Sequence, residues 1–311
     1  MTTKLSDFDG HSLLRKSFIH LRGVGERTER HLWSQGIHDW DQLSLEAPKI
    51  FGAKKLYEIQ EDLDLSRKAW DERDLFYFHK TLPSAERWRM IKGGFADIAY
   101  FDIEASGGGM PPLAESTVIA FLFRGELLQE HEKKAKRNLI EYILAESSIL
   151  CTFNGAAYDV PFLAHEFERP FHKAHVDLCH WLRAQGFQGG LKAIQKAFPH
   201  LHQRSSMDID GWDAVKLWRL YEEGIDAALT TLMCYNAEDV LILHPLLVEA
   251  YNRQSLAQPE YDAGSLELMP LPGLTTEVDP EVFQRLRSGG GSNRWSGRGA
   301  APQRNLNYER E

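Results

Sequence analysis

Acidic side chains occur in three short segments of this chain, and their types and order suit the binding of divalent metal ions. The segments are FDIEAS (101–106), FNGAAYD (153–159) and YNAED (235–239), which supply Asp102, Glu104, Asp159 and Asp239. Mg²⁺ and Mn²⁺ take oxygen ligands, and a pair of such ions can stabilise both the attacking and the leaving oxygen of a displacement at phosphorus. Carboxylates that converge on one point therefore predict two-metal phosphodiester chemistry.

The first two carboxylates lie on a predicted strand, DIAYFDIEA (97–105). Side chains two residues apart on a strand share a face, so Asp102 and Glu104 are expected to point together, away from Phe101 and Ile103 in the core. A solvated strand face is the alternative for any D-x-E pair. The residues that flank this pair are mostly apolar, which favours a metal site over a solvated surface.

The second motif crosses from a short predicted strand (148–153) into a helix that begins near Asp159. Asn154 and Gly155 suit the unusual backbone of such a turn. An aspartate at a helix N-terminus is also a good cap, so capping is the alternative role for Asp159.

In the third motif, Tyr235 and Asp239 are four residues apart on a strongly helical segment and share one face of the helix. In the functional interpretation, Asp239 binds metal and the Tyr235 hydroxyl positions a water molecule. A buried tyrosine hydrogen-bonded to an aspartate is the alternative.

Jointly, the three motifs resemble those of the DEDD superfamily of 3′–5′ exonucleases, which has a ribonuclease H-like fold. The matches are D-x-E, N-x3-[FY]-D and Y-x3-D, in the same order. The tyrosine resembles the DEDDy branch, because Cys234 stands where the sister branch has histidine. The segments HVDLCHWLR (175–183) and GGLKAIQKAF (189–198) are similar to those of YprB-like ribonuclease H-like proteins.

The resemblance, which covers about residues 95–250, implies a 3′–5′ exonuclease with two divalent cations, Mg²⁺ or Mn²⁺. It implies that Asp102, Glu104 and Asp239 hold the metal that activates a water molecule. Asp102, with Asp159 acting through water, would hold the second metal, and Tyr235 would orient the nucleophile. Asn154 and Gly155 would lie near the 3′-terminal nucleotide, or would only shape the turn.

An N-terminal segment, at about 12–36, resembles a helix-hairpin-helix whose turn contains Gly23, Val24 and Gly25. Its helices are expected over Ser12–His20 and Glu26–Gln35. Such a turn exposes backbone N–H groups that can hold a DNA phosphate without reading sequence. A purely structural αα-hairpin is an equal alternative, and the slight preference for DNA over RNA as substrate rests on this hairpin.

The hydrophobic pattern divides the chain into a helical region (1–90), an α/β domain (91–254) and a largely disordered tail (255–311). The resemblance implies that the α/β domain is ribonuclease H-like. In the domain, strands and helices alternate, which predicts an α/β fold with a mixed sheet flanked by helices. A strand hairpin is expected around Arg124-Gly125, followed by helical segments at Lys133–Ala145, 179–198 and 213–251. The tail has few aliphatic residues and many Gly, Pro and polar residues.

Composition restricts the class of protein. The formal net charge of −9 argues against tight metal-free binding to nucleic acid, because phosphate contacts come from lysine and arginine. The three cysteines are scattered and predict buried, reduced thiols rather than a zinc site. With neither a membrane span nor a signal-like N-terminus in the sequence, a cytoplasmic location is expected.

The expected partner is single-stranded nucleic acid with a free 3′ end, and no membrane association is expected. Three alternatives remain. One is a catalytically silent nucleic-acid-binding module, and the second is a structure-specific endonuclease of the same fold. The third is a small-molecule phosphoesterase that uses the same metals.

Overall fold

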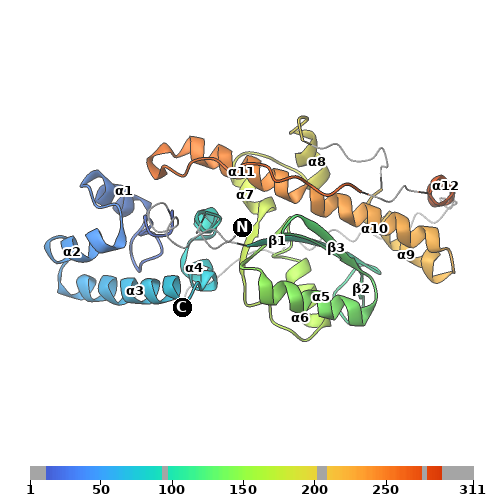
Figure 1. Cartoon of the computed structure of the whole chain (residues 1–311), viewed down its shortest axis with the longest axis horizontal. Helices are drawn as coiled ribbons and strands as arrows, with labels where there is room; N and C mark the ends of the chain where they lie inside the picture. Colours follow the sequence, from blue (N-terminus) through green and yellow to red (C-terminus); the bar gives the residue numbers. More distant parts are fainter. Residues whose placement is uncertain (1–11, 93–96, 202–208, 275–278, 289–311) are drawn as a thin grey trace, which may run out of the picture.

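A five-stranded mixed sheet lies at the centre of the computed structural model, which describes residues 12–92, 97–201, 209–274 and 279–288 (Figure 1). The strand order is β3-β2-β1-β4-β5. The strands are β1 (Ile98–Ala105), β2 (Ser116–Phe123), β3 (Glu126–Glu130), β4 (Ile149–Thr152) and β5 (Ala174–Asp177). The first three pair antiparallel, and β4 and β5 run parallel to β1. The predicted α/β fold with a mixed sheet is confirmed.

The predicted hairpin around Arg124-Gly125 joins β2 to β3. Both turn residues have positive φ, 51° for Arg124 and 83° for Gly125. Two such residues make the turn whose twist matches that of the flanking strands. The register Phe123↔Glu126 follows directly from this two-residue connection.

Helices cover both faces of the sheet. On one face, α5 (Lys133–Glu146) and α6 (Asp159–Glu166) bury Ile140 and Phe162 against Phe101 and Phe121. On the other face lie α7 (Leu178–Ala184), α10 (Asp226–Leu241) and α11 (Leu243–Ala257), whose apolar side chains share a core with Tyr100 and Leu122. Shorter helices are α8 (Leu191–Lys196), α9 (Gly211–Glu222) and α12 (Pro280–Ser288). Within the described parts of the chain, no helix combines the length and apolarity needed to cross a membrane.

The two long helical segments predicted at 179–198 and 213–251 are each interrupted. The first is divided into α7 and α8, and the second into α9, α10 and α11. Gly224, with φ of 93°, follows α9 and reverses the chain. Pro245 lies in the first turn of α11, where it has no N–H to donate to the preceding helix, so α10 and α11 are separate helices.

The N-terminal region is helical from Glu26 onward. It contains α1 (Glu26–Ser34), α2 (Trp40–Ile50), α3 (Ala53–Asp71), α4 (Leu75–Thr81) and the 3₁₀ helix η2 (Ser84–Met90). The helix predicted at Ser12–His20 is wrong, because these residues form turns. The backbone N–H groups of Phe18 and Ile19 donate to the Glu29 carboxylate instead of to carbonyls of a helix.

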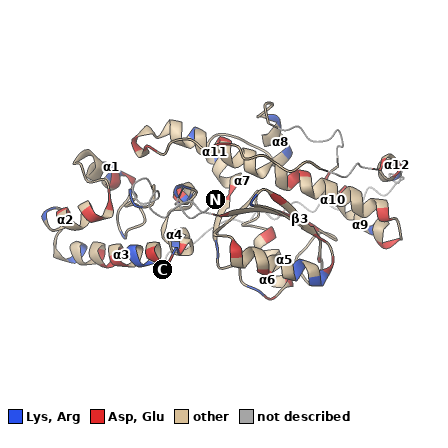
Figure 2. Cartoon of the chain, viewed as in Figure 1, with Lys and Arg blue, Asp and Glu red and all other residues tan. Residues whose placement is uncertain are grey.

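The turn at Gly23, Val24 and Gly25 packs against α3. Gly23 has φ of 64°, and the Lys55 amine lies 2.7 Å from where a Cβ on Gly23 would stand. Lys55 donates to the Arg22 carbonyl, while the Arg22 side chain pairs with Asp62. Figure 2 shows acidic and basic residues interspersed along α3. These contacts favour the structural alternative, and phosphate binding by the turn stays a prediction.

The expectation of a largely disordered tail from residue 255 does not hold for residues 255–274 and 279–288. Asn252 of α11 accepts a hydrogen bond from Leu266 N at 2.7 Å and donates to Leu266 O at 3.0 Å. Tyr261 is buried, and Val282 of α12 is buried in a cluster with residues of α9 and α10. Amide pairing and a few apolar side chains thus order a segment that is poor in aliphatic residues. Residues 289–311 lie outside the described residues.

All three cysteines, Cys151, Cys179 and Cys234, are buried and free of disulfides, as predicted. Burial, and to a lesser degree the charge of Asp177, raises the pKa of the Cys151 thiol well above its ordinary value. Cys151 therefore behaves as an apolar core residue.

His20 makes the N-terminal region sensitive to acid. Its ring packs against Trp40 and Phe78, and its Nε2 lies 3.0 Å from the Ser66 hydroxyl. Burial, followed by the charge of Arg89, lowers the pKa of His20 from 6.5 to about 3. The unfolded chain therefore takes up a proton below about pH 6.5 that the folded chain excludes. The resulting stability is complete above pH 6.5 and is lost as the pH falls toward 3.

We expect the free energy of unfolding to lose about 1.4 kcal/mol per pH unit through His20 between pH 6 and 5. Urea unfolding at pH 7, 6 and 5 measures this, because His20→Gln removes the contribution and flattens the dependence by that amount. His38→Gln, at an exposed position, should retain the wild-type pH dependence. If the free energy of unfolding depends on pH in the same way in His20→Gln and in the wild type, His20 is not a buried, neutral side chain.

Candidate metal centre

Three carboxylates from two elements meet beside the sheet. Oxygen atoms of Asp102, Glu104 and Asp239 all lie within 4.8 Å of one another. The first two residues are on β1, and Asp239 is on α10, which packs across β1 and β2. Glu104 and Asp239 are buried, whereas Asp102 is partly exposed. Among the described residues, this is the cluster of acidic, histidine or cysteine side chains that could hold a metal ion.

The geometry of β1 separates acidic from apolar side chains. Phe101 and Ile103 are buried on the α5–α6 side of the sheet, as predicted from strand alternation. The register with β2 shifts between Ile103 and Ala105, so Glu104 lies at an irregularity of the strand. Such bulges re-aim a side chain at the end of a ladder.

Asp159 lies against the same strand. Its Oδ1 accepts a hydrogen bond from Ile103 N at 3.1 Å, between the two acidic residues of β1. The N-cap of α6 is Tyr158, and Asp159 occupies the first turn. Its carboxylate therefore binds β1 as well as lying near the helix N-terminus. Burial, followed by the charge of Asp102, raises the pKa of Asp159 well above its usual value.

The loop before Asp159 is held by a residue that the sequence analysis did not assign a function. Asp177, at the end of β5, accepts hydrogen bonds from Asn154 N at 2.8 Å and Ala156 N at 3.0 Å. It also accepts from Cys179 N at 3.0 Å, as the N-cap of α7. One carboxylate therefore connects the second motif to the neighbouring strand and helix. The segment HVDLCHWLR contains this aspartate, but its partner loop lies more than twenty residues earlier.

Asn154 and Gly155 differ in their surroundings. Asn154 is exposed and has φ of 66°, a conformation that asparagine tolerates better than most residues. Gly155 is buried, and a Cβ there would stand 2.5 Å from the Thr152 hydroxyl. Gly155 therefore has a packing reason to lack a side chain. Contact of either residue with a nucleotide stays a prediction.

Tyr235 and Asp239 lie on one face of α10 and line the same cavity, of about 410 Å³. The other lining residues are Gly190, Leu191, Lys192, Ala193, Asp210 and Gly211. Both Tyr235 and Asp239 are 8% exposed. The cavity therefore gives a ligand access to one carboxylate of the cluster and to the tyrosine at once.

Asn236 is the second residue that the sequence analysis missed. Its side-chain amide donates to Asp102 Oδ2 at 3.0 Å and to Asp102 O at 3.3 Å, and the residue is fully buried. It thereby fixes the Asp102 carboxylate relative to α10. Its position three residues before Asp239, on the same helix face, was the available signal.

The donor set fits a hard divalent cation. Carboxylate oxygens are the ligands that Mg²⁺ and Mn²⁺ prefer, whereas zinc sites favour histidine and cysteine. Clustered carboxylates also repel one another, and the raised pKa of Asp159 reflects this repulsion together with burial. A bound cation would relieve the repulsion.

Comparison with known proteins agrees with this fold. Residues 99–251 match the RNase_H_2 family model, which belongs to the RNase_H superfamily. These residues therefore form a ribonuclease H-like domain, and they include all four acidic residues and Tyr235. No curated protein matches the sequence.

One similar solved structure is a family B DNA polymerase from the hyperthermophilic archaeon Pyrobaculum calidifontis. The similarity covers 52% of this chain at 17% identity, with a TM-score of 0.41. This chain spans 24% of the length of the polymerase.

Proposed function

We propose that this protein is a metal-dependent 3′–5′ exonuclease that hydrolyses phosphodiester bonds in nucleic acid. The observation that carries the proposal is the meeting of Asp102, Glu104 and Asp239, with oxygens within 4.8 Å, in a ribonuclease H-like domain. Asp159 of α6, which accepts a hydrogen bond from Ile103 N of β1, and Tyr235 of α10 extend this cluster. The arrangement combines ligands for divalent cations with a phenol group beside them.

In this proposal, Asp102, Glu104 and Asp239 would hold one cation, and Asp102, with Asp159 acting through water, would hold a second. The cations, when bound, would lower the pKa of a water molecule and stabilise the charge that develops on the phosphate oxygens. The Tyr235 hydroxyl orients the attacking water. Asn236 keeps the Asp102 carboxylate in place through its 3.0 Å hydrogen bond.

The finer classification is also part of the proposal. Tyr235, four residues before Asp239, supports assignment to the DEDDy branch. The segments around Asp177 and Lys192 support a relationship to YprB-like proteins. The slight preference for DNA rests on the N-terminal turn, whose contacts with α3 favour a structural role, so DNA and RNA need a direct comparison.

The test uses 5′-labelled single-stranded DNA and RNA of the same sequence, incubated with the full chain and Mg²⁺ or Mn²⁺. We expect a ladder that shortens from the 3′ end and is abolished by EDTA and by Asp102→Ala. A circular single strand, which has no 3′ end, should remain intact.

Each alternative has its own outcome in this assay. Cutting of the circle would identify an endonuclease, and binding of the strands without cleavage would identify a silent binding module. Hydrolysis of a nucleotide monoester with no action on either strand would identify a small-molecule phosphoesterase. Any of these three results would overturn the proposal.

Asp177 is expected to position the second motif for catalysis. Asp177→Ala removes hydrogen-bond acceptors for Asn154 N and Ala156 N, so the loop that leads to Asp159 should loosen. We expect a loss of about 1–2 kcal/mol in the free energy of unfolding and an activity about tenfold lower. Urea unfolding and exonuclease rates measure the two effects.

Asp39→Ala is the matched control, because Asp39 caps α2 by accepting from Asp41 N and Gln42 N and is not part of the carboxylate cluster. Asp39→Ala should lower the free energy of unfolding about as much as Asp177→Ala does, and it should leave the exonuclease rate unchanged. Equal rates for the two variants would reduce Asp177 to a helix cap.

A further inference from the structure

The cavity beside the carboxylate cluster has one basic side chain in its lining. Its walls are the start of α8, the start of α9, and the face of α10 that carries Tyr235 and Asp239. Lys192 supplies the positive charge among these lining residues. Asp210 is engaged as the N-cap of α9, where it accepts from Trp212 N and Asp213 N. The cavity is therefore acidic at one end and cationic at the wall formed by α8.

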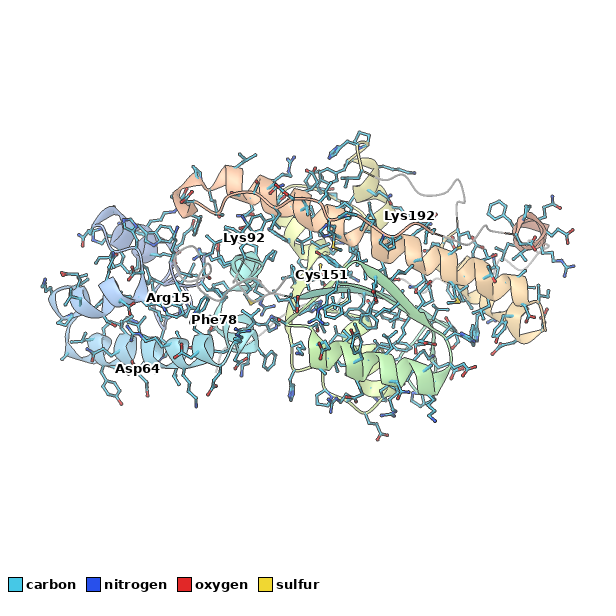
Figure 3. All side chains as sticks on the ribbon, viewed as in Figure 1. Arg15, Asp64, Phe78, Lys92, Cys151 and Lys192 are labelled. Carbon is cyan, nitrogen blue, oxygen red and sulfur yellow. The ribbon has the colours of Figure 1, made fainter. Side chains whose placement is uncertain are left out.

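The position of Lys192 is fixed by the turn that precedes α8. Gly189 has φ of 102°, and a Cβ there would stand 2.7 Å from the Ala193 side chain. The chain therefore folds tightly onto the first turn of α8, which brings Lys192 to α10. Figure 3 shows Lys192 where α8 approaches α10.

Lys192 contacts the residue proposed to orient the water. Its ammonium nitrogen lies 5.2 Å from the centroid of the Tyr235 ring, a cation–π contact. A cation held there lies on the same cavity wall as the tyrosine hydroxyl and Asp239. Trp212, next in the chain to the lining residue Gly211, keeps 67% of its surface exposed, and an exposed indole is a surface on which a nucleobase can stack.

We propose that Lys192 binds a backbone phosphate of a nucleic-acid strand in this cavity and holds the Tyr235 ring in position. The inference rests on the proposed nuclease function and adds a specific contact to it. A lysine ammonium is a compact charge that suits a phosphate oxygen. Its attraction to the strand also offsets the repulsion between the phosphates and the nearby carboxylates. Lys192 is therefore a substrate-binding residue that also positions Tyr235.

The test compares wild type, Lys192→Gln, Lys192→Arg and Lys196→Gln. Lys196 lies on the same helix, is exposed and does not line the cavity, so it is the matched control. For Lys192→Gln we expect a KM for single-stranded oligonucleotide about tenfold higher than wild type. The slope of log affinity against log salt should fall by about 0.7, the value for one phosphate contact to a single strand. Lys192→Arg should keep both the KM and the salt slope close to their wild-type values. Lys196→Gln should match wild type in both.

A substrate change locates the contact. Oligonucleotides with one neutral methylphosphonate linkage, placed in turn at the non-scissile positions nearest the 3′ end, should lose affinity at one position with wild type. With Lys192→Gln, the same linkage should cost little, because the charge it removes has no partner. If Lys192 had a purely structural role, Lys192→Gln would lose affinity at the same methylphosphonate position as the wild type.

Binding is measured separately from cleavage, by fluorescence anisotropy of the labelled strand with Ca²⁺ in place of Mg²⁺. A Lys192-dependent salt slope without any cleavage in Mg²⁺ or Mn²⁺ would support this inference and overturn the nuclease proposal. If wild type and Lys192→Gln cleave the strand with the same KM, salt slope and methylphosphonate pattern, the nuclease proposal would be supported and the inference about Lys192 overturned. If wild type neither binds nor cleaves a strand, both are overturned.

Discussion

Replacing Asp102 by asparagine is expected to reduce the rate of strand hydrolysis by at least about three orders of magnitude. Asp102 belongs to the cluster of oxygens within 4.8 Å, and in the proposed mechanism it contacts both cations. Losing about 4 kcal/mol of metal-assisted charge stabilisation corresponds to about a thousandfold in rate. Asparagine keeps the size of the side chain and an acceptor for the Asn236 amide, so the fold should be retained.

The same substitution should change stability in opposite directions with and without metal. Without metal, removing one charge from the cluster relieves repulsion with Asp159, Glu104 and Asp239, and should raise the free energy of unfolding by on the order of 1 kcal/mol. Mn²⁺ at about a hundred times its dissociation constant should stabilise the wild type by about 2.7 kcal/mol. The same Mn²⁺ concentration should leave the free energy of unfolding of Asp102→Asn nearly unchanged. Urea unfolding with EDTA and with Mn²⁺ measures all four values.

Glu126→Gln is the matched control, since this exposed residue of β3 carries the same charge away from the cluster. It should retain the wild-type rate and the wild-type response to Mn²⁺. Should Asp102→Asn still gain the full stabilisation by Mn²⁺, the cluster would not be the metal site. A normal rate in that variant would remove the mechanism.

The parts of the site that follow from local rules could be predicted from the sequence. Strand alternation placed Asp102 and Glu104 together, and helical spacing placed Tyr235 over Asp239. The hairpin at Arg124-Gly125 followed from turn chemistry. Each of these depends on residues that are close in the chain, where period and backbone preference decide the geometry.

The missed residues act over long sequence separations. Asn236 binds Asp102, which is 134 residues earlier, and Asp177 binds a loop more than twenty residues before it. Nothing in the local pattern around either residue shows which distant group it will meet. The segment 255–274 was misjudged for a similar reason, because Asn252 supplies the hydrogen bonds that order it at Leu266.

Glu29 is a charged helix residue whose burial its neighbours in the sequence do not indicate. In the sequence it belongs to an acidic pair beside the N-terminal turn, but in the structure it is fully buried, as is its partner Arg89. The two form paired hydrogen bonds, each of 2.9 Å. Burial alone would lower the pKa of Arg89, but the hydrogen bonds and charge of Glu29, together with smaller contributions from Glu86 and Tyr261, outweigh it and raise that pKa.

This ion pair connects three parts of the chain. Glu29 lies on α1, Arg89 on η2, and Arg89 also donates to the hydroxyl of Tyr261, in the 3₁₀ helix η3 (Pro259–Tyr261) after the ribonuclease H-like domain. Glu29 further accepts from Phe18 N at 2.6 Å. Because the pair is inaccessible to water, neither charge can be solvated if its partner is removed.

We therefore expect Arg89→Met to lower the free energy of unfolding by about 3–5 kcal/mol, because Glu29 would remain as a buried, uncompensated charge. The double variant Glu29→Leu/Arg89→Met should lose less free energy of unfolding than the sum of the losses in the two single variants, since it leaves neither Glu29 nor Arg89 as a buried charge without its partner.

Arg15→Met is the control, because the Arg15–Asp41 pair is partly exposed and should contribute about 0.5 kcal/mol to the free energy of unfolding. Urea unfolding followed by Trp fluorescence measures each variant. Since the Glu29–Arg89 pair joins the N-terminal helices to the segment after the ribonuclease H-like domain, Arg89→Met should also divide one cooperative transition into two. A single transition with a loss below about 1 kcal/mol would show that apolar packing alone joins the two regions.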